Sequence, residues 1–147
     1  MSEEAVEMLV REVLNALNSH DVEKTLALFS DDGVWITPSG TFKGKAELKR
    51  YITWIFETLD DMKLEETGSG LMTRGSNALV EHKQSGIMDG EPMKFMSMCS
   101  YEFDENNQVK SLKTIYDRLT LAEQAADKWL EKTVVHAVVK KVQEGLP

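Results

Sequence analysis

The stretch VREVLNALNSHDVEKTLALFSDDGVW, residues 10–35, predicts two helices followed by a strand. Its first part repeats apolar residues at helical spacing, and the same pattern extends back to Glu3. The polar residues 18–21 are typical of a helix end followed by a new N-cap, so a second short helix carries Val22, Leu26 and Phe29 on its apolar side. After a turn predicted at residues 30–33, a short strand runs to Thr37 and ends at Pro38.

Downstream of this stretch, a third helix is expected to open at Gly44 and to end near Leu59. From Met62 the apolar residues alternate instead, which predicts four strands. They span residues 62–74, 77–89, 94–104 and 109–119. The short polar segments between them suit hairpins, so consecutive strands are expected to pair in antiparallel fashion.

The C-terminal part predicts one more helix. Residues 120–123, TLAE, fit a capping box with Thr120 as the N-cap, and the helix would then begin at Leu121. The β-branched pair Val134–Val135 leaves a break within it open. We therefore expect one domain over residues 1–125 and a helical extension over 126–147, packed on the same domain or on a dimer partner.

The order of these elements predicts an α+β fold. Three N-terminal helices would pack on a curved sheet, mixed or antiparallel, so that the whole forms a cone with a pocket inside and an extra C-terminal helix outside.

Composition excludes several classes of function. The chain has 147 residues and a formal net charge of −8, which disfavours nucleic acid and anionic membrane surfaces as partners. One cysteine excludes an internal disulfide framework, and the three histidines have no metal-site spacing. No apolar run is long enough to span a membrane, and the first residues are acidic where a signal peptide would be basic. A cytoplasmic single domain is expected.

Three stretches carry a resemblance to a known family. Residues 10–35, 42–48 (FKGKAEL) and 111–124 (SLKTIYDRLTLAEQ) resemble, in order and spacing, the NTF2-like superfamily, and the last resembles its SnoaL-like branch. The resemblance covers roughly residues 5–125 and implies the cone-shaped NTF2-like fold. The branch includes polyketide cyclases and is similar to ketosteroid isomerases, and the superfamily also contains binding and dimerisation modules, so the fold alone does not give the function.

The catalytic groups of two related branches are mostly missing. Ketosteroid isomerases have an aspartate base, a tyrosine and a second acid. The resemblance places Thr37, Val13 or a neighbour, and Cys99 at these positions, so none of the three groups is retained. The Arg-x-Asp pair of epoxide hydrolases of this fold falls on His82 and Gln84.

The last-strand acid of SnoaL-like cyclases has a match in Asp117, which the resemblance implies as a catalytic residue. Strand alternation groups Asp117 with Ile115 and Leu119, where burial would raise the pKa of its carboxyl toward neutrality and suit it to proton transfer. The alternatives are an exposed acid at the strand end, or one paired with Arg118 or Lys113.

His82 is expected to assist Asp117. Alternation groups it with Val80 and Gln84, a mixed face that suits a pocket wall, where an imidazole could shuttle a proton. A histidine hydrogen-bonded at a strand edge is the alternative.

The remaining candidates are side chains that would line a pocket. Cys99 shares a strand face with Tyr101, and it is read more readily as a small buried hydrophobe than as a nucleophile. The aromatic candidates are large enough to floor a pocket, although core packing is the more frequent role. The predicted substrate-binding residues are Trp35, Thr37, Tyr51, Trp54, Cys99 and Tyr101.

Together these features predict a pocket protein for a small apolar, carbonyl-bearing molecule. The first hypothesis is a cofactor-free acid–base enzyme, a cyclase, isomerase or dehydratase, that uses Asp117 and His82. The second is a binding or dimerisation module without catalysis. No metal or cofactor is expected. The chain is expected to form a homodimer that pairs through the sheet.

Overall fold

A single curved sheet of six strands carries the fold, with the strand order β2-β1-β6-β5-β4-β3. The computed structural model describes residues 1–126 and 129–144. The helices are α1 Glu3–Asn18, α2 Val22–Ala27, α3 Gly44–Thr58, α4 Arg118–Ala125 and α5 Trp129–Glu144. The strands are β1 Phe29–Thr37, β2 Gly40–Lys43, β3 Asp60–Arg74, β4 Asn77–Met88, β5 Glu91–Phe103 and β6 Val109–Tyr116. The predicted α+β class and the four long strands are confirmed.

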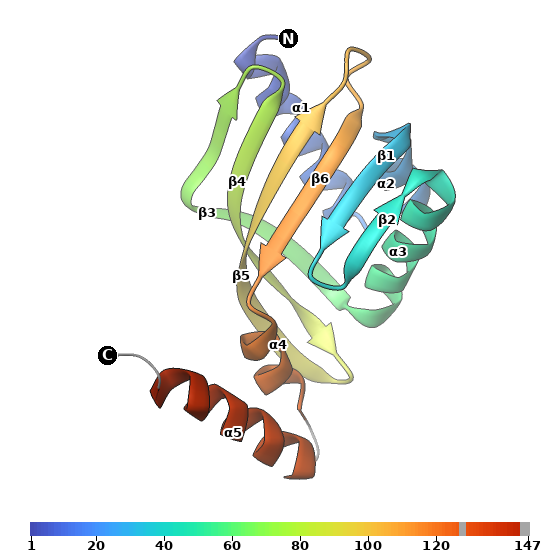
Figure 1. Cartoon of the computed structure of the whole chain (residues 1–147). Coiled ribbons are helices and arrows are strands. Elements are labelled where there is room, and N and C mark those ends of the chain that lie inside the picture. The colour runs from blue at the N-terminus through green and yellow to red at the C-terminus, as the bar shows by residue number, and fades with distance from the viewer. Residues whose placement is uncertain (127–128, 145–147) are drawn as a thin grey trace.

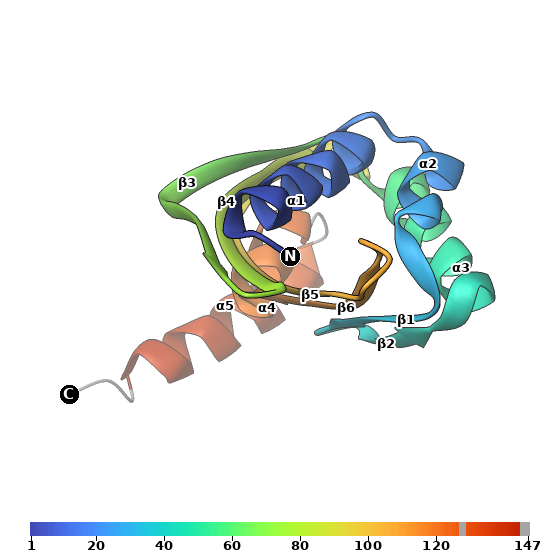
Figure 2. The ribbon, with the colours of Figure 1, turned by 90° about the horizontal axis from the view of Figure 1, so that it is seen from above.

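The sheet curls around the N-terminal helices (Figure 1). Seen from above, α1 lies inside the curve made by β3, β4 and β5, while α2 and α3 close the side next to β1 and β2 (Figure 2). The core lies between them and contains the fully buried Val10 of α1, Ile52 of α3 and Leu112 of β6. A helix with one apolar stripe buries that stripe against the concave face of a sheet, which produces the cone.

Capping residues fix where the first two helices begin. The Ser2 side chain accepts a hydrogen bond from the Ala5 N–H at 3.2 Å, and Asp21 accepts one from the Lys24 N–H at 2.9 Å. Both satisfy N–H groups that a helix start leaves without intrahelical partners. The N-cap predicted within residues 18–21 is therefore confirmed, and it is Asp21.

The first strand is longer than predicted. The turn expected at residues 30–33 is wrong, because these residues continue β1 as a bulge: Phe29 pairs with Val109 and Val34 with Ser111, so β1 holds three extra residues between the two pairs. Phe29, expected on α2, is the first residue of this strand. The parallel pairing of β1 with β6 makes the sheet mixed.

A short strand was missed. β2 pairs antiparallel with β1 through a turn at Pro38 and Ser39, and it ends just before α3. Its four residues carry too short an alternation to be distinguished from a loop.

The C-terminal prediction needs correction. The single helix expected from Leu121 is two helices: α4 begins at Arg118 and ends at Ala125, whereas Val134 and Val135 lie inside the unbroken α5. Figure 1 shows α5 below the sheet, next to α4 and directed away from the cone. Packing of residues 126–147 on the domain or on a partner stays a prediction, as does the homodimer, and residues 127–128 and 145–147 lie outside the described residues.

Candidate functional site

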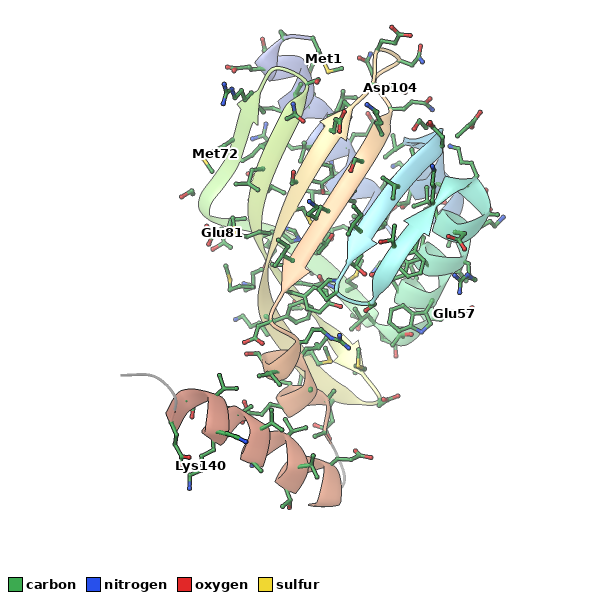
Figure 3. The ribbon with its side chains drawn as sticks, viewed as in Figure 1. Met1, Glu57, Met72, Glu81, Asp104 and Lys140 are labelled. Atoms are coloured by element: carbon green, nitrogen blue, oxygen red, sulfur yellow. The ribbon has the colours of Figure 1, made fainter. Side chains whose placement is uncertain are left out.

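A cavity of about 70 Å³ lies between α1, α3 and the concave face of the sheet. Its wall comes from α1, α3, α4 and every strand except β2, and among the described residues that line it there is no Asp, Glu, Lys or Arg. Figure 3 shows the labelled charged side chains Glu57, Glu81, Asp104 and Lys140 on the outside of the ribbon. The interior is therefore an apolar hollow, and the net negative charge belongs to the outer surface.

A row of polar groups crosses the apolar wall. The register of β4, β5 and β6 places His82 beside Ser97, and Cys99 beside Thr114. The indole N–H of Trp35 donates to Thr114 Oγ1 at 2.9 Å, and Thr114 Oγ1 is in turn 3.3 Å from Cys99 Sγ. Cys99 Sγ is 4.0 Å from His82 Nε2. Three neighbouring strands and β1 thus hold four side chains in one continuous row.

His82 is neutral near neutral pH. Its side chain is buried, and this desolvation lowers the pKa of the imidazole to about 4, outweighing an interaction with the Val80 backbone that raises it. A buried neutral imidazole can donate or accept a hydrogen bond without the cost of burying a charge. His82 therefore suits a neutral polar group better than an anion.

Four buried side-chain polar atoms make no hydrogen bond of ordinary geometry with the described residues. They are Oγ1 of Thr25, Nδ1 of His82, Oγ of Ser97 and the hydroxyl of Tyr101. The Tyr101 hydroxyl interacts with the Cys99 thiol, which is a weak hydrogen-bonding group. Two of these side chains, His82 and Tyr101, line the cavity. Leaving a buried donor or acceptor without a partner costs about 1–3 kcal/mol, so a ligand that pairs with it gains that difference.

The Cys99 thiol and the Tyr51 phenol of the cavity wall are protonated near neutral pH. Burial raises the pKa of Cys99 to about 11, and burial raises the pKa of Tyr51 to about 12. Since the thiolate is the nucleophilic form, Cys99 acts here as a buried wall residue, as the sequence favours.

Asp117 does not occupy the environment predicted for it. β6 ends at Tyr116, and the exposed Asp117 side chain is the N-cap of α4. Its carboxylate accepts hydrogen bonds from the Thr120 hydroxyl and from the Leu119 N–H, each at 2.8 Å. These bonds, that of the Thr120 hydroxyl above all, hold the pKa of the carboxyl below its usual value. The expected burial, the raised pKa and the capping role given to Thr120 are all wrong.

The error has a simple origin in strand alternation. Along β6 the inward residues are Leu112 and Thr114, whereas Lys113 and the 62% exposed Ile115 point outward. Asp117 shares the parity of the outward pair, and Lys113 was the signal that this face meets solvent.

Replacing Asp117 by Ala should loosen α4. Loss of an N-cap costs about 1 kcal/mol, because the N–H groups of Leu119 and Thr120 lose their acceptor. We expect about fivefold faster amide exchange over Leu121 and the following residues of α4, with little change in the rest of the sheet. The matched variant Asp117→Asn keeps an acceptor and should exchange like the wild type; equal exchange in Asp117→Ala would contradict the capping role.

The structure brings six of the eight predicted site residues together in the cavity wall. They are His82, Trp35, Tyr51, Trp54, Cys99 and Tyr101. Neither Asp117 nor Thr37 is among the described lining residues, and Thr37 instead orders the β1–β2 turn by accepting a hydrogen bond from the Ser39 N–H at 3.0 Å.

Some wall residues were missed by sequence reasoning. Thr114 is the hydrogen-bond link between Trp35 and Cys99, and its buried position follows from the same alternation that places Lys113 outside. Leu121 reaches the cavity from α4, and no local pattern in the sequence indicates this, because it depends on how α4 folds back. Gln124 fixes that fold by accepting from the Lys94 N–H at 2.7 Å and donating to the Lys94 carbonyl at 2.9 Å.

The described residues form neither a metal-ligand cluster nor a membrane-spanning helix. No group of three or more His, Cys, Asp or Glu side chains in the described ranges lies close enough to hold a metal ion. None of the helices in the described part of the chain is long and apolar enough to cross a membrane.

Comparison with known proteins places this geometry in a family. The family model described as a SnoaL-like domain matches residues 10–112. No curated protein matches the sequence.

Solved structures share the fold at low sequence identity. A protein of Xanthomonas campestris pv. campestris that is proposed to be a polyketide cyclase is 14% identical, with 84% of this chain and 98% of that chain covered and a TM-score of 0.77. An NTF2-like protein of unknown function from Burkholderia pseudomallei is 18% identical, with 86% and 100% covered and a TM-score of 0.75.

A third similar structure contains a small molecule. It is a hypothetical protein of Catenulispora acidiphila with a ketosteroid isomerase-like fold, in complex with trimethylamine. It is 15% identical, with 80% of this chain and 91% of that chain covered and a TM-score of 0.72.

Proposed function

The chain belongs to the SnoaL-like family of the NTF2-like superfamily, and we propose that it binds a small, neutral, mainly apolar molecule with one carbonyl or hydroxyl group. The ligand would occupy the cavity beneath α1 and α3. The observation that carries this proposal is the pair of cavity-lining polar atoms without ordinary hydrogen bonds to described residues, Nδ1 of His82 and the hydroxyl of Tyr101.

The chemistry of the wall supports a neutral ligand. Because no described lining residue is charged and His82 is neutral near neutral pH, an ionised group would lose its hydration without a counter-charge. A carbonyl oxygen can accept from the Tyr101 hydroxyl, and a ligand hydroxyl can pair with either group. The apolar remainder of the ligand would contact side chains such as Leu64 and Leu112.

The cavity volume limits the size of the ligand. At about 70 Å³ it is smaller than a cavity of about 150 Å³ that holds benzene, so a ligand of about six heavy atoms, such as cyclopentanone, fits only if the wall adjusts. Met62 and Met88 line it, and their unbranched side chains can adopt other rotamers to enlarge it. The trimethylamine held by the Catenulispora protein supports small-molecule binding by this fold.

The acid–base enzyme that uses Asp117 and His82 stays a prediction. His82 is a titratable group of the cavity wall, whereas the Asp117 carboxylate caps α4. Hydrogen–deuterium exchange at the carbons beside the carbonyl of a bound ketone would detect proton transfer. Exchange above the buffer rate that is lost in His82→Gln would establish catalysis, and exchange at the buffer rate would leave binding as the function.

Binding can be tested with a matched pair of probes. Cyclopentanone and methylenecyclopentane have the same shape but differ in the carbonyl oxygen. One hydrogen bond to a buried group that otherwise has no partner is worth about 1–2 kcal/mol. In an NMR titration we therefore expect the ketone to bind about tenfold more tightly, relative to the alkene, than the free energies of transfer of the two probes from water to hydrocarbon predict. An affinity ratio equal to the one predicted from transfer alone would overturn the proposed recognition of a polar group.

Tyr101→Phe separates binding from stability. Since the Tyr101 hydroxyl makes no ordinary hydrogen bond with the described residues, its removal should leave the free energy of unfolding unchanged or raise it by about 1 kcal/mol. Ketone affinity should fall about fivefold to tenfold in the same variant. Tyr116→Phe is the matched control, because that hydroxyl lies 3.2 Å from Ser39 Oγ and is already partnered. A clear loss of stability in Tyr101→Phe with unchanged ketone affinity would contradict the proposal.

A further inference from the structure

An open groove of about 340 Å³ lies outside the cavity, between α3 and the β1–β2 hairpin. Five described residues line it: Ser39, Phe42, Arg50, Tyr51 and Trp54. Tyr51 and Trp54 line the inner cavity as well, so the groove and the cavity share one aromatic wall.

Three rings of this wall lie nearly parallel. The Phe42 and Tyr51 ring centroids are 4.0 Å apart with planes 9° apart, and those of Tyr51 and Trp54 are 5.9 Å apart with planes 20° apart. Trp54 is 49% exposed, which leaves much of the largest ring in contact with solvent. A flat aromatic molecule in the groove would extend this stack and cover apolar surface that water now contacts.

Arg50 supplies a positive charge to the same groove. Its guanidinium carbon is 5.7 Å from the centre of the Phe42 ring. Its Nη2 atom is 3.8 Å from Oε1 of Glu47, a loose ion pair on an exposed helix face. The planar guanidinium has several N–H donors in a geometry that matches a carboxylate. On a chain with a net charge of −8, an anion needs such a local cation to bind.

We infer that this groove is a second binding site, for a flat aromatic carboxylate whose ring stacks on Trp54 and whose carboxylate pairs with Arg50. It goes beyond the function proposed for the inner cavity: the cavity has no charge among its described lining residues, whereas the groove has both an aromatic face and a cation. The two sites therefore differ in the charge of the group they accept.

Benzoate and its neutral isostere benzamide test this inference. A single exposed ion pair increases affinity by at most about fivefold, so benzoate should bind about fivefold more tightly than benzamide at low salt. Its binding should also shift the resonances of the Trp54 indole. In Arg50→Gln the two probes should bind equally. In Trp54→Leu both should bind about fivefold more weakly, because the stacked ring is lost.

Lys49→Gln is the matched control. It removes a positive charge from the neighbouring position of α3, where the lysine pairs with Glu23 instead of lining the groove. It should keep the fivefold preference for benzoate. Equal affinities in the wild type, a preference that survives Arg50→Gln, or shifts centred on His82 instead of Trp54 would each overturn the inference. Arg50→Gln should leave cyclopentanone binding unchanged, so failure of the cavity proposal is recognised separately.

Discussion

Acidification is expected to remove about 3 kcal/mol of folding free energy through His82 alone, because burial lowers its pKa from about 6.5 to about 4. The unfolded chain then binds a proton on this imidazole at a pH where the native protein does not. The contribution of His82 to the free energy of unfolding is fully present above about pH 6.5 and is lost as the pH decreases from there to about 4. Below this range it no longer changes, because His82 is protonated in both the folded and the unfolded state.

The contribution of His82 is isolated by comparing variants over this pH window. The free energy of unfolding, measured with urea, should decrease in the wild type as the pH falls through this window. This dependence on pH should be much weaker in His82→Gln, whatever the substitution does to stability near neutral pH. His136→Gln, on the exposed face of α5, should keep the pH dependence of the wild type. The same pH dependence in His82→Gln and in the wild type would show that His82 is solvated. It would also contradict the conclusion that His82 is a neutral polar group of the cavity wall.

Thr114→Val is expected to cost about 2 kcal/mol, because the buried indole N–H of Trp35 loses its acceptor. The substitution keeps the volume of the side chain and removes the hydroxyl, so packing changes little. The Cys99 thiol loses its 3.3 Å partner as well. Urea unfolding measures the loss, and the Trp35 indole N–H resonance should shift upfield as its hydrogen bond is lost.

Two variants separate this hydrogen bond from packing. Thr114→Ser keeps the hydroxyl, so it should retain the Trp35 resonance of the wild type. Replacing both partners, Trp35→Phe with Thr114→Val, leaves no unpaired N–H, so the two substitutions should couple by about 1 kcal/mol in a double-mutant cycle. A Thr114→Val protein as stable as the wild type would contradict the stabilising hydrogen bond between Trp35 and Thr114, and with it the row of interacting polar groups from Trp35 to His82.

The long elements of the fold could be predicted from the sequence because their patterns are strong and local. The alternation of apolar and polar residues after Met62 predicts four strands, and the apolar residues at helical spacing in α1 predict which face of this helix is buried. β2 and the bulge in β1 could not be predicted in this way. Both depend on pairing with β1 or β6, partners that are set by the whole sheet.

The candidate site was predictable in part for the same reason. His82, Cys99 and Tyr101 follow from alternation within long strands whose register is regular. Asp117 does not, because β6 stops at Tyr116 and the chain turns there into α4. A family resemblance indicated the position of this acid, but the local chain decides whether its carboxylate is buried or caps a helix.

The location of bound cyclopentanone tests the central claim most directly. In an NMR experiment that detects intermolecular nuclear Overhauser effects, the ketone should contact side chains of the cavity wall, such as the methyl groups of Leu64 and Leu112 and the Tyr101 ring. These contacts should weaken in Tyr101→Phe and persist in Tyr116→Phe. Contacts confined to the outer surface, or a ketone that reaches no wall methyl group at concentrations where it binds, would contradict the account.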